Sequence, residues 1–335
     1  MSELKSILIA GVGSIGERHL RCFAATGRAE LAICEVNAAL RQTIAERYGI
    51  KREFGDYNEA IGGQPDAVVI CTPAPAHVPL ALAAARAGAH LLIEKPLSTS
   101  LAGVDELQHE VAQRRLTAAV AYVYRAHPAL AAMRDAIRSG RFGEPVQIIA
   151  TCGQHFPLYR PAYRETYYRD RATGGGAVQD ALTHVINAGE WLVGPVDRLE
   201  ADADHLVLEG VTVEDTVHVL TRHGRVMGSF NLNQHQAPNE VTLTVVCRRG
   251  TARFEYHECR WRWMSEAGGQ WHDEPAGPLE RDALFTRQAN AFLDAVASRH
   301  APLCTLDEAA QTLRVNLAIL DSAAQQNWQN IRDAK

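Results

Sequence analysis

Residues 7–16 read ILIAGVGSIG, an apolar run that leads directly into three glycines spaced as GxGxxG. In parallel α/β folds this spacing marks the turn between the first strand and the first helix. Gly11 permits the tight turn, Gly13 leaves room for a pyrophosphate, and Gly16 lets the helix pack close to the strand. The stretch therefore predicts a Rossmann domain that binds a dinucleotide.

The residues that follow the loop specify the predicted cofactor further. Ser14 and Ile15 open the predicted helix, whose free N–H groups attract phosphate oxygens. Glu35 ends the next predicted strand, 19 residues after the last glycine, where an acid can accept hydrogen bonds from the adenosine ribose. A 2′-phosphate about 4 Å from this carboxylate would cost on the order of 4 kcal/mol. Because Val36 and Asn37 supply no compensating cation, we expect NAD rather than NADP.

Apolar runs and amphipathic stretches alternate over the first part of the chain. Continuous apolar strands separated by helices are typical of a parallel sheet covered on both faces. We expect strands at 4–10, 31–35, 67–71, 91–93 and 117–121, and helices at 14–26, 38–48, 78–87 and 103–115. The pattern predicts an NAD-binding domain over residues 1–122.

The pattern changes after about residue 122. Closely spaced strand signals with short turns indicate a large, mostly antiparallel open sheet. We expect strands at 145–151, 199–208, 216–222, 225–233, 241–247 and 251–256, and helices at 129–139, 281–299 and 306–326. The fold class is therefore α/β, with an α+β domain for substrate binding and oligomerisation over residues 123–335.

Composition excludes several classes of function. The 335 residues carry a formal net charge of −5, which argues against nonspecific nucleic-acid binding. No apolar run reaches the roughly 18 residues of a membrane-spanning helix. The seven cysteines form no CxxC pair, so we read them as free thiols and expect a cytoplasmic protein. The scattered histidines lack the spacing of metal ligands, so no metal is predicted.

Two further motifs follow predicted strands of the first domain. Thr72 and Pro73 end one of these strands at the carboxyl edge of the sheet, where ligands bind in such folds. His77 begins the next helix, either as a cofactor contact or as a helix-start residue without a catalytic role. Glu94 and Lys95 precede a proline after the strand at 91–93, where the nicotinamide is expected.

In the second domain, three glycines at 174–176 precede Asp180 and His184. These two residues are four apart on a predicted helix and so share one face. A pair with this spacing, taken alone, is more often structural. The segment 155–171 is rich in arginine and tyrosine, which suits a sugar ring bearing an anion. Its candidate substrate contacts are His155, Arg160, Tyr163 and Arg164, although a surface loop or an oligomer contact would look the same.

The motifs occur in a characteristic order: GVGSIG at 11–16, CTPAPAH at 71–77, EKP at 94–96, YRAHP at 124–128 and GGGAVQDALTH at 174–184. This order resembles the glucose–fructose oxidoreductase / inositol dehydrogenase / rhizopine catabolism family. The likeness covers nearly the whole chain, and its motifs end before Trp191. One departure is at residues 123–126, where many relatives read more like YNYRF; Arg125 there is a further candidate substrate contact.

The resemblance implies an oxidoreductase that transfers a hydride between NAD and a sugar, polyol or sugar derivative. It implies a catalytic trio at Lys95, Asp180 and His184, a cis Lys95–Pro96 bond, and an open sheet that packs against another subunit in a homodimer or homotetramer. His184 would accept the hydroxyl proton, and Lys95 would stabilise the developing alkoxide. Two alternatives stay open: an NAD-using glycosidase that acts by transient oxidation, and a dinucleotide-dependent regulator without catalysis.

Overall fold

The computed structural model describes residues 5–298 and 300–331. Leu4, the first residue of one predicted strand, and Arg299, the last residue of one predicted helix, lie outside the described residues. The chain divides into two compact units. The first combines the described residues up to Ala126 with Glu280–Ala310, and the second combines His127–Leu279 with the chain from Gln311 on. The segment 280–310 thus joins the first unit, although the predicted second domain includes it. A domain boundary after residue 122 stays a prediction.

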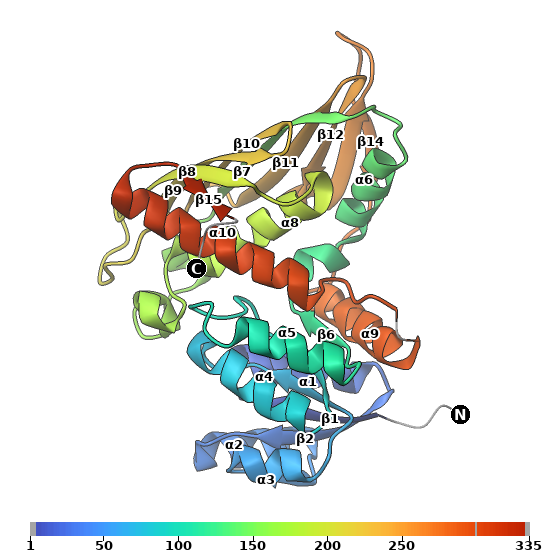
Figure 1. Cartoon of the computed structure of the whole chain (residues 1–335), viewed down its shortest axis with the longest axis vertical. Coiled ribbons are helices and arrows are strands. Elements are labelled where there is room, and N and C mark those ends of the chain that lie inside the picture. Colours follow the sequence, from blue (N-terminus) through green and yellow to red (C-terminus); the bar gives the residue numbers. More distant parts are fainter. Residues whose placement is uncertain (1–4, 299, 332–335) are drawn as a thin grey trace. The chain divides into compact units, whose positions relative to one another are not determined.

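The first unit contains a six-stranded parallel sheet in the order β3-β2-β1-β4-β5-β6, as expected for a Rossmann fold (Figure 1). Its strands are β1 (Lys5–Ala10), β2 (Ala29–Cys34), β3 (Arg52–Phe54), β4 (Ala67–Ile70), β5 (His90–Ile93) and β6 (Ala118–Val120). Its helices are α1 (Ser14–Ala25), α2 (Ala38–Tyr48), α3 (Tyr57–Gly62), α4 (His77–Arg86), α5 (Val104–Gln113) and α9 (Ala283–Ser298). The sequence patterns missed the short elements β3 and α3.

Helix α9 belongs to the first unit because it packs against α1. The rings of Phe23 and Phe292 meet edge to face with their centroids 6.3 Å apart. Just before α9, the carboxylate of Asp282 accepts two hydrogen bonds from Arg21, at 2.5 and 3.0 Å. Side chains of α1 thus make both the aromatic contact with α9 and the ionic contact with the residue before it, although α1 and α9 lie far apart in the sequence.

The second unit contains a nine-stranded sheet in the order β14-β13-β12-β11-β7-β10-β9-β8-β15 (Figure 1). Among the described strands only β7 and β10 pair in parallel, which confirms the prediction of a mostly antiparallel sheet. Its strands are β7 (Pro145–Gly153), β8 (Arg198–Asp204), β9 (Thr216–His223), β10 (Val226–Asn233), β11 (Glu240–Cys247), β12 (Gly250–Glu255), β13 (Arg260–Met264), β14 (His272–Pro275) and β15 (Gln329–Asn330). The last three were not predicted.

Helices α6 (Pro128–Arg138) and α8 (Thr183–Val193) pack on one face of this sheet. Two further helices are the single turn α7 (Phe156–Tyr159) and α10 (Leu306–Gln325). The predicted strand 199–208 is wrong at its end, because β8 stops at Asp204. The amides of Leu206, Val207 and Leu208 bind the buried carboxylate of Asp215 at 2.7–3.1 Å instead of a neighbouring strand.

Candidate active site

The glycine loop between β1 and α1 has the geometry that its spacing predicts. Gly11 has a φ of +83°, which side chains disfavour. A Cβ on Gly16 would overlap the carbonyl oxygen of Gly11, whereas a Cβ on Gly13 would meet nothing within 4 Å. No side chain of the described residues caps the N-terminus of α1, and Gly13 and Ser14 are exposed. The loop therefore leaves open space and helix N–H groups where a pyrophosphate would bind.

Glu35 follows β2 and faces the glycine loop. One carboxylate oxygen accepts the N–H of Val12 at 3.1 Å, and the other accepts the N–H of Asn37 at 3.0 Å. Arg41 donates to the backbone carbonyl of Glu35 at 2.7 Å. The carboxylate is thus fixed beside the loop, and its remaining lone pairs suit ribose hydroxyls.

The turn after β4 is tied to the turn after β5 by His77. Its Nε2 lies 2.7 Å from the carbonyl oxygen of Thr72, and its Nδ1 lies 2.9 Å from that of Pro96. The ring is 1% exposed, and burial lowers its pKa. His77 therefore holds two backbone turns together and offers little surface to a cofactor. The hydroxyl of Thr72 is buried without a hydrogen-bond partner among the described residues, next to Pro73 at the carboxyl edge of the sheet.

Glu94 is turned into the protein rather than toward the edge of the sheet. Its Oε1 lies 2.6 Å from Nε2 of His19 on α1, and its Oε2 accepts the N–H of Lys95 at 3.0 Å. Burial opposes ionisation, but the hydrogen bond and the charge of His19 hold the pKa of Glu94 below its ordinary value. The Lys95–Pro96 bond is cis, as the resemblance implies. Lys95 thus stands on a turn fixed by Glu94 and His77.

His19 is a residue that sequence reasoning missed. Its side chain is 1% exposed and pairs with Glu94 across 75 positions of sequence. The available signal was its place three residues after Gly16, on the buried side of α1. A polar side chain on an otherwise apolar helix face requires a buried partner.

Asp180 lies in the turn just before α8, and His184 is the second residue of α8; that the two act together stays a prediction. Residues Val178–Leu182 form a π-helical turn that continues into the α-helix at Thr183. Such turns frequently occur at functional sites. Both side chains are partly exposed. The hydroxyl of Tyr167 donates to Oδ1 of Asp180 at 2.5 Å.

A buried acid anchors the beginning of this helical segment. The side chain of Glu214 is 0% exposed, and its Oε2 lies 2.9 Å from the guanidinium of Arg171. Its Oε1 accepts the N–H of Val178 at 3.1 Å. A Cβ on Gly176 would overlap this carboxylate. The third glycine of the motif is therefore needed for the close approach of Glu214, another residue that sequence reasoning missed.

The predicted substrate contacts in the segment 155–171 have different surroundings. Tyr163 is 3% exposed and donates its hydroxyl to the carbonyl of Glu209 at 2.7 Å, so it packs in the interior. Arg164 is paired with the Glu209 side chain at 3.4 Å. Arg160 is exposed, and His155 is half-buried with its Nδ1 unpartnered among the described residues. Arg160 and His155 are thus the two contacts that this geometry leaves available.

The side chain of Arg125 binds other residues of the first unit. Its side chain is 2% exposed, and Nη1 lies 3.0 Å from the carbonyl oxygen of Leu303 and 2.7 Å from Oε1 of Glu308. These contacts fasten the chain after β6 to the segment that follows α9. They favour a structural role over the predicted contact with substrate.

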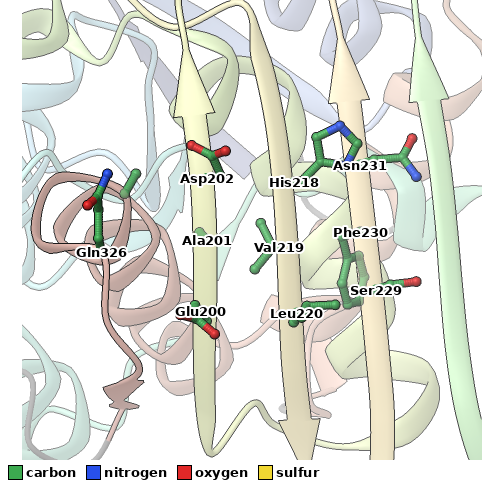
Figure 2. A pocket seen from close by; sticks show the side chains of 11 residues that line it. Glu200, Ala201, Asp202, His218, Val219, Leu220, Ser229, Phe230, Asn231 and Gln326 are labelled. Carbon is green, nitrogen blue, oxygen red and sulfur yellow. The ribbon is translucent and has the colours of Figure 1, made fainter.

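A hollow of about 390 Å³ lies over β8, β9 and β10, and none of the predicted site residues lines it. Figure 2 shows Asp202, His218 and Asn231 side by side on these three strands. The hollow contains none of the groups expected to do chemistry. Across residues 5–298 and 300–331, no helix is long and apolar enough to cross a membrane.

Two family models match the chain. Residues 5–122 match "Oxidoreductase family, NAD-binding Rossmann fold", and residues 130–253 match "GFO/IDH/MocA C-terminal domain". The chain belongs to the GFO/IDH/MocA oxidoreductase family. The first unit is therefore an NAD-binding Rossmann fold, as the glycine loop and Glu35 predicted.

Two members of the GFO/IDH/MocA family that are named for their activities are similar to this chain, one over nearly its whole length and one over about half of it. A levoglucosan dehydrogenase of Pseudarthrobacter phenanthrenivorans is 26% identical over 99% of both chains. An inositol 2-dehydrogenase of Acidothermus cellulolyticus is 31% identical over 55% of this chain and 52% of its own.

Solved structures of the GFO/IDH/MocA family share the fold. A levoglucosan dehydrogenase in complex with NADH superimposes with a TM-score of 0.90 and 22% identity, over 98% of this chain and 99% of the other. An oxidoreductase from Agrobacterium radiobacter in complex with NAD+, L-tartaric acid and magnesium gives a TM-score of 0.87 and 18% identity, over 98% of both chains.

Proposed function

We propose that the protein is an NAD-dependent dehydrogenase that oxidises a hydroxyl group of a cyclic sugar, polyol or sugar derivative, with Lys95, Asp180 and His184 as its catalytic residues. The observation that carries the proposal is the fixed position of Lys95 at the carboxyl edge of the NAD-binding sheet. His77 and Glu94 hold this turn through contacts of 2.7–3.0 Å. A cation held at that edge suits the stabilisation of an alkoxide beside the cofactor.

The residues divide the work as the chemistry requires. Bound NAD supplies the hydride acceptor. His184 accepts the hydroxyl proton, because an imidazole titrates near neutral pH and general-base help is worth about 10²–10⁴ in rate. Lys95 stabilises the negative charge that develops on the oxygen. Asp180, which Tyr167 holds at 2.5 Å, orients the substrate hydroxyl or His184.

The proposed substrate class follows the names of the relatives, which are dehydrogenases of levoglucosan and of inositol. Two observations bear on a charged substrate. Arg164 and Arg171 are paired with Glu209 and Glu214, so neither is available for an anion without breaking an ion pair. Arg160 is exposed and is the arginine that we propose for a substrate carboxylate or phosphate.

We also propose a cytoplasmic homodimer or homotetramer. On the open face of the second unit's sheet, Leu220 and Met227 are 54% and 52% exposed. Glu200 and Asp202 lie toward one edge of this sheet and Arg253 toward the other. If two such faces pack together about a two-fold axis that runs parallel to the strands between them, Glu200 and Asp202 of one copy lie opposite Arg253 of the other. Light scattering that gives a monomer mass would count against this assembly.

A panel of polyols, aldoses, anhydrosugars and sugar acids with NAD, followed by NADH absorbance, tests the proposed activity. For the best substrate, His184→Ala is expected to lower kcat about 10²–10⁴-fold while the dissociation constant of NAD stays unchanged. His257→Ala, an exposed histidine of the same unit, serves as the matched control.

Each alternative gives a distinct outcome. Release of a free sugar from a glycoside without net NADH would favour the NAD-using glycosidase. NAD binding without turnover of any compound would favour the regulator. Full turnover by His184→Ala on a true substrate would contradict the role given to that histidine.

A further inference from the structure

The triple glycine before the catalytic helix packs against a short turn from the segment that precedes it. The N–H of Gly176 donates to the carbonyl of Tyr168 at 3.1 Å, and the N–H of Gly175 donates to that of Asp170 at 2.9 Å. A Cβ on Gly175 would overlap the carbonyl oxygen of Tyr168. The approach of the two turns is therefore closer than any residue other than glycine permits.

This close packing fixes the position of Tyr167. The turn Tyr167–Arg169 is a single 3-10 turn that would not hold its shape alone. The hydroxyl of Thr173 donates to the carbonyl of Tyr167 at 2.7 Å and lies 2.9 Å from that of Asp170. The backbone of Tyr167 is thus held by the same loop that leads into the helix carrying Asp180.

The side chain of Tyr167 then reaches Asp180. Its hydroxyl lies 2.5 Å from Oδ1, a short distance typical of a hydrogen bond to an ionised acceptor. The tyrosine is still 47% exposed, so its hydroxyl is not part of the packed interior. A hydrogen bond at an exposed surface contributes little to folding, but it restricts the orientation of the carboxylate that it binds.

We propose that Tyr167 is a positioning residue for the oxidation, and that the close approach at Gly175 brings its hydroxyl to Asp180. The inference rests on the proposed function, because it gives Asp180 a role toward the substrate. Through its bond to Oδ1, Tyr167 restricts the rotation of the Asp180 carboxylate. Loss of the hydroxyl removes this one constraint and widens the range of orientations that the carboxylate samples.

The chain offers a matched control in Tyr159. It belongs to the same segment and is also 47% exposed. Its hydroxyl makes no hydrogen bond within the described residues. Tyr159→Phe and Tyr167→Phe therefore remove the same atom from equally exposed rings, and they differ in the contact with Asp180.

The first test is steady-state oxidation of the best substrate by the full-length enzyme. Tyr167→Phe is expected to lower kcat about tenfold, the typical effect of one hydrogen bond to a charged group, with the KM for NAD unchanged. Tyr159→Phe should change kcat less than about twofold. In an Asp180→Ala background, the further loss caused by Tyr167→Phe should shrink to less than about twofold, because the acceptor is gone.

Equal kcat values for the two phenylalanine variants, or a full tenfold loss that persists in Asp180→Ala, would overturn the inference. A wild-type enzyme that turns over no substrate counts against the proposed function instead. The positioning role is then decided by crystal structures of wild type and Tyr167→Phe. A carboxylate of Asp180 that moves or splits into two conformers supports the inference, and an unmoved carboxylate overturns it.

Discussion

In the first unit the predicted cofactor site consists mainly of backbone positions, whereas in the second unit the predicted reaction site is held by side chains. The glycine loop works through a positive φ at Gly11, an open space at Gly13 and a helix start without a cap. Asp180 is instead held by Tyr167, and the start of its helical segment is held by Glu214.

This difference between a backbone site and a side-chain site predicts how each responds to amino-acid substitution. A backbone site depends on local spacing, so a short motif carries nearly all of its geometry. A side-chain site depends on pairs of residues far apart in the chain, such as Arg171 with Glu214, 43 positions away, and Tyr168 with Gln234, 66 positions away. A substitution in the glycine loop should therefore change mainly the affinity for NAD. A substitution in one of these pairs of the second unit should change mainly the free energy of unfolding.

The largest expected effect is on the glycine loop. Gly13→Ala should fold with wild-type stability, because its Cβ meets no atom of the protein within 4 Å. It should weaken NAD binding about 10- to 100-fold, because the methyl group occupies space that the pyrophosphate needs. Fluorescence titration with NADH and thermal unfolding measure the two quantities separately.

Gly16→Ala is the matched control for that substitution. Its Cβ would overlap the carbonyl oxygen of Gly11, so the variant should lose stability even without NAD. If both variants keep wild-type melting temperatures and NADH affinities, the glycines do not define the cofactor site, and the contrast between the two units fails.

A smaller effect is expected for the ion pairs of the second unit. Arg171→Gln should lower the free energy of unfolding by about 2 kcal/mol, because it leaves the fully buried carboxylate of Glu214 without its cation. Arg164→Gln should cost less than about 1 kcal/mol, since Arg164 and Glu209 are 50% and 87% exposed. Thermal and urea unfolding of the two variants compare them directly, and equal losses would show that burial of Glu214 does not govern this site.

The sequence predicted the first unit nearly completely, for a physical reason. Its strands are continuous apolar runs and its ligand loop is a local motif, so both are visible within a few residues. The elements that escaped prediction were β3, with three residues, and α3, with six. The joining of 280–310 to this unit could not be read from local patterns, because it depends on contacts such as Phe23 with Phe292.

The second unit was predicted in outline, but its contacts were not. Alternation of apolar residues indicated most of its strands, while β14 lies at an edge with exposed residues and gives no such signal. Asp180 and His184 could be named from a motif, yet their partner Tyr167 and the anchor Glu214 could not. Tyr163 and Arg164 were proposed as substrate contacts from their residue types alone. In the structure Tyr163 donates to the backbone carbonyl of Glu209, and Arg164 pairs with the side chain of Glu209.

Glu35 is the exception that sharpens the comparison, because it places a charged side chain directly beside the glycine loop. Wild type is expected to bind NAD more tightly than NADP, since a 2′-phosphate would approach a carboxylate held in place by the amides of Val12 and Asn37. Glu35→Gln removes the charge and keeps the length of the side chain. It should narrow the difference between the two affinities by about tenfold, with the gain on the NADP side.

Glu35→Gln also distinguishes two roles of the carboxylate: repulsion of the 2′-phosphate of NADP, and hydrogen bonding to the backbone of the glycine loop. The amide oxygen of glutamine can accept only one of the two backbone N–H groups without a change of rotamer, because its other terminal atom is a donor. A modest loss of NAD affinity is therefore expected alongside the gain for NADP. If NADP binding does not improve while NAD binding falls, the carboxylate serves the loop rather than cofactor choice. Equal affinity of wild type for NAD and NADP would remove the basis for assigning Glu35 to the ribose at all.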